Sequence, residues 1–175
     1  MRRTGTTRRG ALTATGAIAM GAVLAGCGGG SGQREGSAGT DTATAAEQAA
    51  AMRTERSLRA GAAGTSRELL ARYEQVVRAY PATAAGLSPL RDAVRAHAEA
   101  LAADGGKARV PSRTRATDAG SALKELAAAE RRTADIHTAT LLKAPPELAR
   151  LLASIAAAGA AHAFLLTELA KETSS

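Results

Sequence analysis

Apolar side chains recur every three or four residues over most of the chain after about residue 42, and they almost never alternate with polar ones. A period near 3.6 is typical of helices with one buried face, whereas a period of two would indicate strands. The pattern therefore predicts helices and no strands. The expected helices cover about 42–80, 88–104, 118–143 and 146–171.

Helix-breaking and capping residues separate these four segments. Pro81 ends the first one, in which Gly61 and Gly64 form a weak point. Ser88 followed by Pro89 is typical of an N-cap and a first helical residue. The other boundaries are Asp104-Gly105-Gly106, an N-cap at Asp118 or at Ser121, and the break at Ala144-Pro145-Pro146.

Each segment carries one apolar stripe with polar residues elsewhere, which predicts an all-α four-helix bundle over residues 42–173. The stripes also hold a few polar side chains. The predicted buried positions are Leu58, Ala62, Leu69, Tyr73, Val76 and Tyr80; Leu87, Leu90, Val94, His97 and Leu101; Leu123, Leu126, Glu130, Thr133, His137 and Leu141; and Leu148, Leu152, Ile155, Gly159, His162, Leu166 and Leu169.

The expected connections favour a ferritin-like topology. The first and last pairs of helices are joined by short links, but about 13 residues separate the second helix from the third, enough to recross the bundle when extended. The ferritin-like arrangement consists of two helical hairpins joined by one long crossover between helices 2 and 3.

Residues 43–170 share this layout, and they contain Ala-rich segments such as "PLRDAVRAHAEAL" and "DAGSALKELAAAERRTADIHTATL". In both respects they resemble small ferritin-like domains of unknown function from actinobacteria. The metal-binding members of that family carry Glu-x-x-His on two helices. No Glu-x-x-His occurs in this chain, and His97-Ala98-Glu99 has a different spacing. The resemblance therefore implies the fold and not the family's di-iron chemistry.

The N-terminus reads as an export signal. The first nine residues carry four arginines and no acid, and residues 11–25 are almost entirely apolar or small. Such a segment is too short for a membrane span, which takes roughly 20 residues, so residues 1–26 are predicted to be a cleaved signal peptide. Residues 7–12, "TRRGAL", also resemble a twin-arginine motif, which leaves general secretion (Sec) and twin-arginine export both open.

The sequence Leu24-Ala25-Gly26-Cys27 resembles the lipobox of bacterial lipoproteins and contains the chain's single cysteine. The resemblance implies that Cys27 carries a diacylglyceryl group, with palmitate-type acyl chains, and anchors the mature protein to the outer face of the cell membrane. A buried or disulfide-bonded cysteine is the alternative. Residues 27–41 are Gly- and Ser-rich and are expected to form a flexible tether to the bundle.

Charge argues against nucleic acid as a partner. The chain has 23 basic and 16 acidic residues, and four of the basic ones lie in the predicted signal peptide, which leaves a mature net charge of +3. It has two tyrosines, one phenylalanine and no tryptophan for base stacking. Nucleic-acid binding needs clustered cations and usually stacking aromatics.

One group of residues has the chemistry of a site. Across antiparallel helices, Glu130 is expected opposite about residue 160, near His162, and His97 opposite about residue 72, near Tyr73. His97, Glu130 and His162 are candidate ligands for one iron, manganese or zinc ion. The alternatives are a set of hydrogen-bonded core residues, or side chains turned toward solvent. His137 is expected to lie apart from this group.

The predicted function is a cell-envelope lipoprotein whose helical bundle binds a partner, such as another envelope protein, or serves as a scaffold, with no enzymatic activity and no cofactor. The chain lacks a nucleophile elbow, a phosphate loop after a strand, and a cysteine pair. The alternative is a ferritin-like metal-binding or redox protein with an altered mid-bundle site.

Overall fold

The computed structural model describes residues 37–102 and 116–173, which belong to one compact unit, Ser37–Ser175. The predicted signal peptide, Cys27 and most of the predicted tether lie outside the described residues. So does most of the link between the second and third helices.

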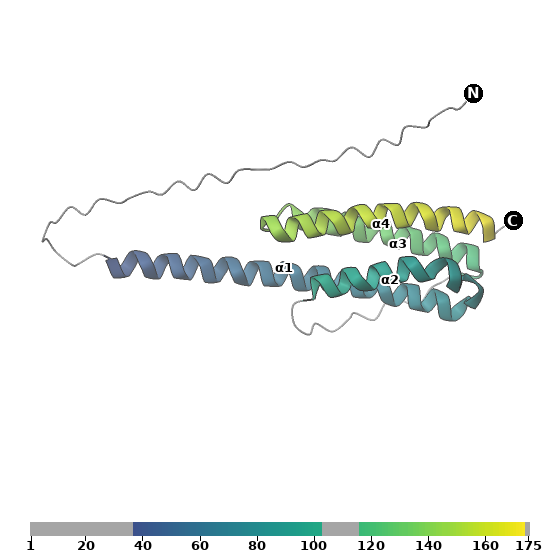
Figure 1. The fold of residues 1–175 in the computed structure, drawn as a ribbon, viewed down its shortest axis with the longest axis horizontal. Coiled ribbons are helices and arrows are strands. Elements are labelled where there is room, and N and C mark those ends of the chain that lie inside the picture. The colour runs from purple at the N-terminus through teal and green to yellow at the C-terminus, as the bar shows by residue number, and fades with distance from the viewer. Residues whose placement is uncertain (1–36, 103–115, 174–175) are drawn as a thin grey trace, which may run out of the picture. The chain divides into compact units, whose positions relative to one another are not determined.

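The described residues form helices and turns and contain no strand, as predicted. The helices are α1 (Ser37–Ala79), α2 (Ala84–Leu101), α3 (Ala119–Leu141) and α4 (Pro146–Thr173), and a short 3-10 helix, η1 (Pro81–Thr83), connects α1 to α2 (Figure 1).

Helix α1 is longer than expected at its start. It begins at Ser37, so residues 37–41, which we expected in the tether, are helical. No proline lies between residues 37 and 44, so each added residue can join the existing helix, which continues past the capping-type residues Asp41 and Thr44. The helix also passes through Gly61 and Gly64 without a break, and the alanines between them, Ala62 and Ala63, are buried. Residues 44–57 are mostly exposed and extend beyond the other helices (Figure 1).

The predicted start of α2 is wrong. The helix begins at Ala84, directly after η1, so Pro89 lies inside it and Ser88 is not the N-cap. The Ser88 hydroxyl instead lies 3.5 Å from Asp92 Oδ2. A proline in the preceding 3-10 turn, Pro81, already sets the helical direction of the chain, which explains why no second start signal is needed.

Asp118 is the N-cap of α3. Its carboxylate accepts hydrogen bonds from the Ser121 backbone N–H and from the Ser121 hydroxyl, both at 2.8 Å. Of the two candidates for this cap, the structure therefore selects Asp118. Helices α2 and α3 end at Leu101 and Leu141, two or three residues before their predicted ends.

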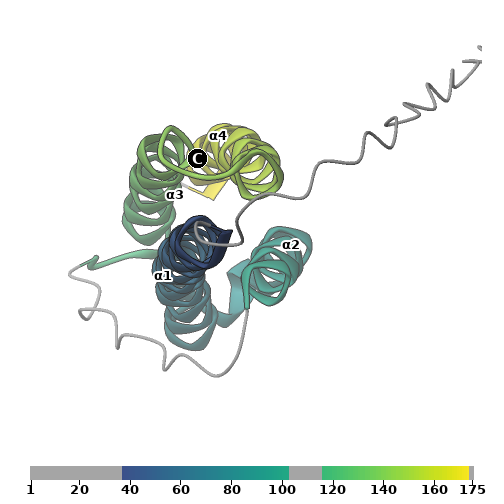
Figure 2. The same cartoon turned by 90° about the vertical axis from the view of Figure 1, so that its left-hand side faces the viewer.

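The four helices pack as a bundle. Helix α3 lies against α4, and α1 lies between α2 and α3 (Figure 2). Every predicted stripe position is buried or half-buried. The half-buried ones are Leu58, Tyr80, His97, Thr133, Leu141 and Leu169.

The core consists of two hydrophobic clusters. The first includes Leu69, Val76, Leu87, Val94, Leu123, Leu126 and Leu166, and the second includes Ala62, Ala63, Leu101, Leu148, Leu152 and Ile155. The last residue of α2, Leu101, belongs to the second cluster. Leu123, in the first turns of α3, belongs to the first cluster.

Among the described residues, α4 is the one helix whose length and composition would allow it to cross a membrane. Its most apolar 18-residue window has a mean hydropathy of 1.6, and 39% of that window is buried inside the protein. Core helices of soluble proteins also pass this test.

Candidate functional site

Polar side chains from all four helices are buried or half-buried next to the two hydrophobic clusters. Helix α1 contributes Ser66, between Ala63 and Leu69, and α2 contributes His97, between Val94 and Leu101. The polar layer is defined here as Ser66, Tyr73, His97, Glu130, His137 and His162. Buried polar groups need hydrogen-bond partners, so the contacts within this layer decide what it can do.

Glu130 is the centre of the layer. Its side chain is 1% exposed, and its Oε1 atom accepts a hydrogen bond from the Tyr73 hydroxyl at 2.6 Å. The Nδ1 atom of His162 lies 3.1 Å from the same oxygen and donates to it when Nδ1 carries the proton. The structure thus brings Glu130 and His162 together, as the turn between α3 and α4 predicted, and it also places Tyr73, which was predicted beside His97, on the same carboxylate.

Tyr73 is fully buried beside this carboxylate. Burial, and then the negative charge and hydrogen bond of Glu130, raise the pKa of the Tyr73 phenol far above its usual value. The phenol is therefore neutral across the physiological range and serves Glu130 as a hydrogen-bond donor.

A glycine makes room for the carboxylate. A Cβ atom at Gly159 of α4 would lie 3.3 Å from Glu130 Oε2 and 3.5 Å from the Ala134 Cβ. Glycine in the middle of a helix costs about 1 kcal/mol relative to alanine. The close approach of Glu130 explains why a small residue fits best here.

His97 reaches the layer from α2 by stacking on His162. The two ring centroids are 6.2 Å apart and the ring planes differ by 19°. His97 is half-buried, so it lies between His162 and solvent. Burial lowers the pKa of His97, the nearby His162 lowers it further, and Glu130 acts in the opposite direction.

His137 has a different partner, in agreement with its expected separation from Glu130. It is fully buried, and its Nε2 atom lies 3.2 Å from the Ser66 hydroxyl oxygen. Its Nδ1 atom is buried and has no hydrogen-bond partner among the residues that the structure describes. Burial, and to a smaller extent His97, lower the pKa of His137 to about 4, so the ring is neutral near pH 7.

Ser66 was missed in the sequence. It lies on the predicted stripe of α1, four residues after Ala62 and seven before Tyr73, and helical spacing alone could have found it. A serine in an Ala-rich helix carries little signal by itself, because it is equally common on exposed faces.

The layer supplies an acid-base pair and a stacked ring, and its side chains mainly bond to one another. Within residues 37–102 and 116–173, no group of three or more His, Cys, Asp or Glu side chains is placed to hold a metal ion. His97, Glu130 and His162 are thus neighbours in one layer without forming a ligand set. What the arrangement can do is hold the buried Glu130 Oε1 atom between the Tyr73 hydroxyl and His162 Nδ1.

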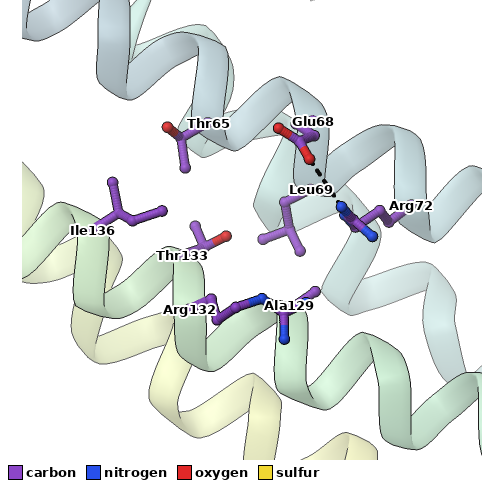
Figure 3. A pocket seen from close by; sticks show the side chains of 8 residues that line it. All are labelled: Thr65, Glu68, Leu69, Arg72, Ala129, Arg132, Thr133 and Ile136. Atoms are coloured by element: carbon purple, nitrogen blue, oxygen red, sulfur yellow. Dashed lines mark hydrogen bonds and ion pairs between the residues drawn. The ribbon is translucent and has the colours of Figure 1, made fainter. Parts of the chain in front are cut away.

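A small surface cavity of about 100 Å³ lies between α1 and α3. Figure 3 shows Thr65, Glu68, Leu69 and Arg72 on one side of it and Ala129, Arg132, Thr133 and Ile136 on the other. Arg72 is paired with Glu68 at 2.9 Å, so the cavity carries both signs of charge. Its hydroxyl groups belong to Thr65 and Thr133, and among the described lining residues no histidine is present to activate them as nucleophiles.

Comparison of the chain with protein-family models, with curated proteins and with solved structures finds no match.

Proposed function

We propose that this protein is a cell-envelope lipoprotein, held on the extracytoplasmic face of the cell membrane through lipid on Cys27 and exported by the Sec or the twin-arginine route. Its helical bundle is proposed to act as a non-enzymatic binding or scaffold domain. The anchor rests on the basic and apolar N-terminal segments followed by Leu24-Ala25-Gly26-Cys27.

The bundle is proposed to have the ferritin-like crossover between α2 and α3. Leu101, at the end of α2, belongs to a different hydrophobic cluster from Leu123, near the start of α3. This difference supports the topology. A connection of this kind makes α2 and α3 parallel, with α1 and α2 forming one hairpin and α3 and α4 the other.

The observation that carries the non-enzymatic role is the pairing of the core's reactive groups with one another. Both the Tyr73 hydroxyl and His162 Nδ1 are directed at the single oxygen Oε1 of Glu130, which is 1% exposed. A catalytic acid or base needs access to a substrate, and this carboxylate has none. The exposed apolar side chains of α4, Phe164 and Leu165, offer a surface for a partner instead.

Metabolic labelling with a radioactive fatty acid tests the anchor. The full chain is expected to take up label and to fractionate with membranes, and Cys27→Ala is expected to lose both properties. Label that persists in Cys27→Ala would contradict the anchor. A Ser31→Ala variant, which changes a residue just after the cysteine, serves as the matched control and is expected to label normally.

The second candidate is a ferritin-like metal-binding or redox protein with an altered site. It is favoured by the buried His137 Nδ1 atom, which has no partner, and by the placing of His97 beside His162. A di-metal centre of this fold generally uses about four carboxylates, whereas this layer has one, Glu130. That leaves a single ion, and His97, Glu130 and His162 would have to move from the positions described here to surround it.

Loading the purified protein with iron, manganese and zinc, followed by elemental analysis, separates the two candidates. We expect much less than one metal per chain. A value near one that falls in His162→Ala, but not in the exposed control Lys124→Ala, would establish the metal-binding alternative.

A further inference from the structure

The outward face of α4 is not covered by any other part of residues 37–102 and 116–173. Phe164 and Leu165 are 63% and 49% exposed, and the other exposed positions in the middle of the helix are alanines and a serine. The positions on this face repeat with alternating steps of four and three residues, which is the pattern of a coiled-coil seam. They are Arg150, Ser154, Ala157, Ala161, Phe164 and Glu168.

Charges lie only toward the two ends of this face. Glu147 and Arg150 form an ion pair near the start of α4, and Lys171 pairs with Glu168 at 2.7 Å near its end. Residues 151–167 contain no Asp, Glu, Lys or Arg. The start of α4 therefore carries one acid and one base, and its end carries Glu168, Lys171 and Glu172, so a partner helix meets a different charge pattern at each end.

The order of charges fits an antiparallel second copy of the same helix. When Arg150 of one copy lies opposite Glu168 of the other, the two-fold axis falls at the level of residue 159. The same axis places Glu147 opposite Lys171, so both contacts join opposite charges. A parallel pair in register would place each charge opposite itself, which is unfavourable.

The side-chain sizes agree with the same register. Phe164 of one copy lies opposite Ser154 of the other, and Leu165 lies opposite Ala153. At the centre, Ala157 lies opposite Ala161. Large side chains thus meet small ones, and small residues at the centre let two helices approach closely.

We infer that the outward face of α4 binds the same face of a second copy, forming an antiparallel two-fold dimer. A bilayer is the less favourable occupant, because alanine and serine present little apolar area to lipid and the long cationic side chains of an interfacial helix are missing between residues 151 and 167. The inference rests on the proposed binding role and deepens it by naming the partner.

Disulfide cross-linking of the full chain in membranes tests the inference. Two copies with different C-terminal tags are co-expressed, one carrying Ala157→Cys and the other Ala161→Cys, and membranes are treated with a mild oxidant. The proposed register brings these two positions together at closely packed helices, where a disulfide can form. The matched control pair is Ala96→Cys with Ala100→Cys, which are also exposed alanines four residues apart, on α2.

The α4 pair is expected to give about tenfold more dimer carrying both tags than the α2 pair, because a specific contact raises the effective concentration of the two thiols. In that background, Arg150→Glu in both copies is expected to lower the yield. Adding Glu168→Arg is expected to restore it, since the charges are then exchanged across the axis.

A cross-linking yield equal to that of the α2 control pair overturns the inference. A yield that falls by the same amount with Arg150→Glu alone and with Arg150→Glu plus Glu168→Arg also overturns it. An environment-sensitive dye on Ala157→Cys identifies the other occupant: blue-shifted emission in membranes, together with control-level cross-linking, assigns this face to the bilayer. If cross-linking fails while Cys27 is still labelled with fatty acid, the dimer is wrong and the proposed anchor stands.

Discussion

The hydroxyl group of Tyr73 in α1 donates a 2.6 Å hydrogen bond to Oε1 of Glu130 in α3, across 57 residues of sequence. Both side chains are almost completely removed from solvent, at 0% and 1% exposure. A short hydrogen bond to a buried carboxylate is among the stronger ones in proteins. This contact therefore ties α1 to α3 and fixes how the two helices lie against each other.

Tyr73→Phe is expected to lower the free energy of unfolding by about 1 to 3 kcal/mol, because it leaves the Glu130 carboxylate with one donor fewer in a buried position. Urea unfolding at pH 7 measures the change. The matched control is Tyr80→Phe, which removes the bond from the half-buried Tyr80 hydroxyl to the Ala116 carbonyl at 3.0 Å and is expected to cost about 1 kcal/mol or less. Equal losses in the two variants would contradict the central role of Glu130.

Gly159→Ala tests the room that Glu130 occupies. Alanine is favoured over glycine in a helix by about 1 kcal/mol, so Gly61→Ala, where nothing lies within 4 Å of the added Cβ, is expected to stabilise the protein by roughly that amount. At Gly159 the new methyl group would press on Glu130 Oε2, whose partner oxygen is held by Tyr73 and His162.

We therefore expect Gly159→Ala to give no gain in the free energy of unfolding, or a loss. In a Glu130→Ala background the contact is gone, and the same substitution is expected to become stabilising. The coupling between positions 130 and 159 is measured by thermal and urea unfolding of the parent protein, Gly159→Ala, Glu130→Ala and the double variant. A gain at Gly159 as large as at Gly61, in the presence of Glu130, would show that the carboxylate moves away freely.

The sequence predicted the four helices well because each carries an apolar stripe of helical period. The same stripes placed Glu130 near His162 and His97 near Tyr73, since levels in an antiparallel pair follow from the position of the turn. The start of α2 was not predictable from its local signals. Ser88 and Pro89 read as a cap, but the 3-10 turn at Pro81–Thr83 had already begun the helix.

The details of the polar layer depend on side-chain directions that periodicity does not give. Whether His97 would point at a shared ligand or stack on His162 depends on rotation about α2, and one residue of helix turns a side chain by about 100°. Ser66 was overlooked because a serine is compatible with either face of an Ala-rich helix. Its role depends on His137, which lies 71 residues away in sequence.

Asp118→Ala is expected to reduce stability, since it removes the acceptor for the Ser121 N–H at the start of α3. Asp118→Asn keeps a capping oxygen and is expected to lose much less. The hydrogen bonds to Ser121 lower the pKa of Asp118. The ionised carboxylate therefore stabilises the helix near pH 7, and this stabilisation is lost as the pH falls through the lowered pKa. Unfolding of both variants at pH 7 measures the cap, and equal losses would contradict a capping role.

As the pH is lowered, the histidine at position 137 is expected to be the first group to destabilise the fold. The carboxylates whose pKa values are lowered become protonated only at a lower pH. In the unfolded chain a histidine has a pKa near 6.5, whereas burial lowers the pKa of His137 in the fold to about 4. Between these values the unfolded chain binds more protons, so stability falls as the pH is lowered. From pH 7 to pH 5 the expected loss from this residue is about 2 kcal/mol.

Urea unfolding at pH 7 and at pH 5 measures this loss in the parent protein and in Ser66→Ala/His137→Leu. The double variant removes the titrating ring and does not leave its hydroxyl partner buried without a bond. Its stability is expected to depend on pH by about 2 kcal/mol less than that of the parent. His97→Gln is the matched control: His97 is only half-buried and its pKa is lowered in the same direction, so a smaller part of the pH dependence is expected to disappear. A pH dependence that survives unchanged in the double variant would mean that His137 becomes protonated inside the fold at no cost, which its burial and its unpartnered Nδ1 atom argue against.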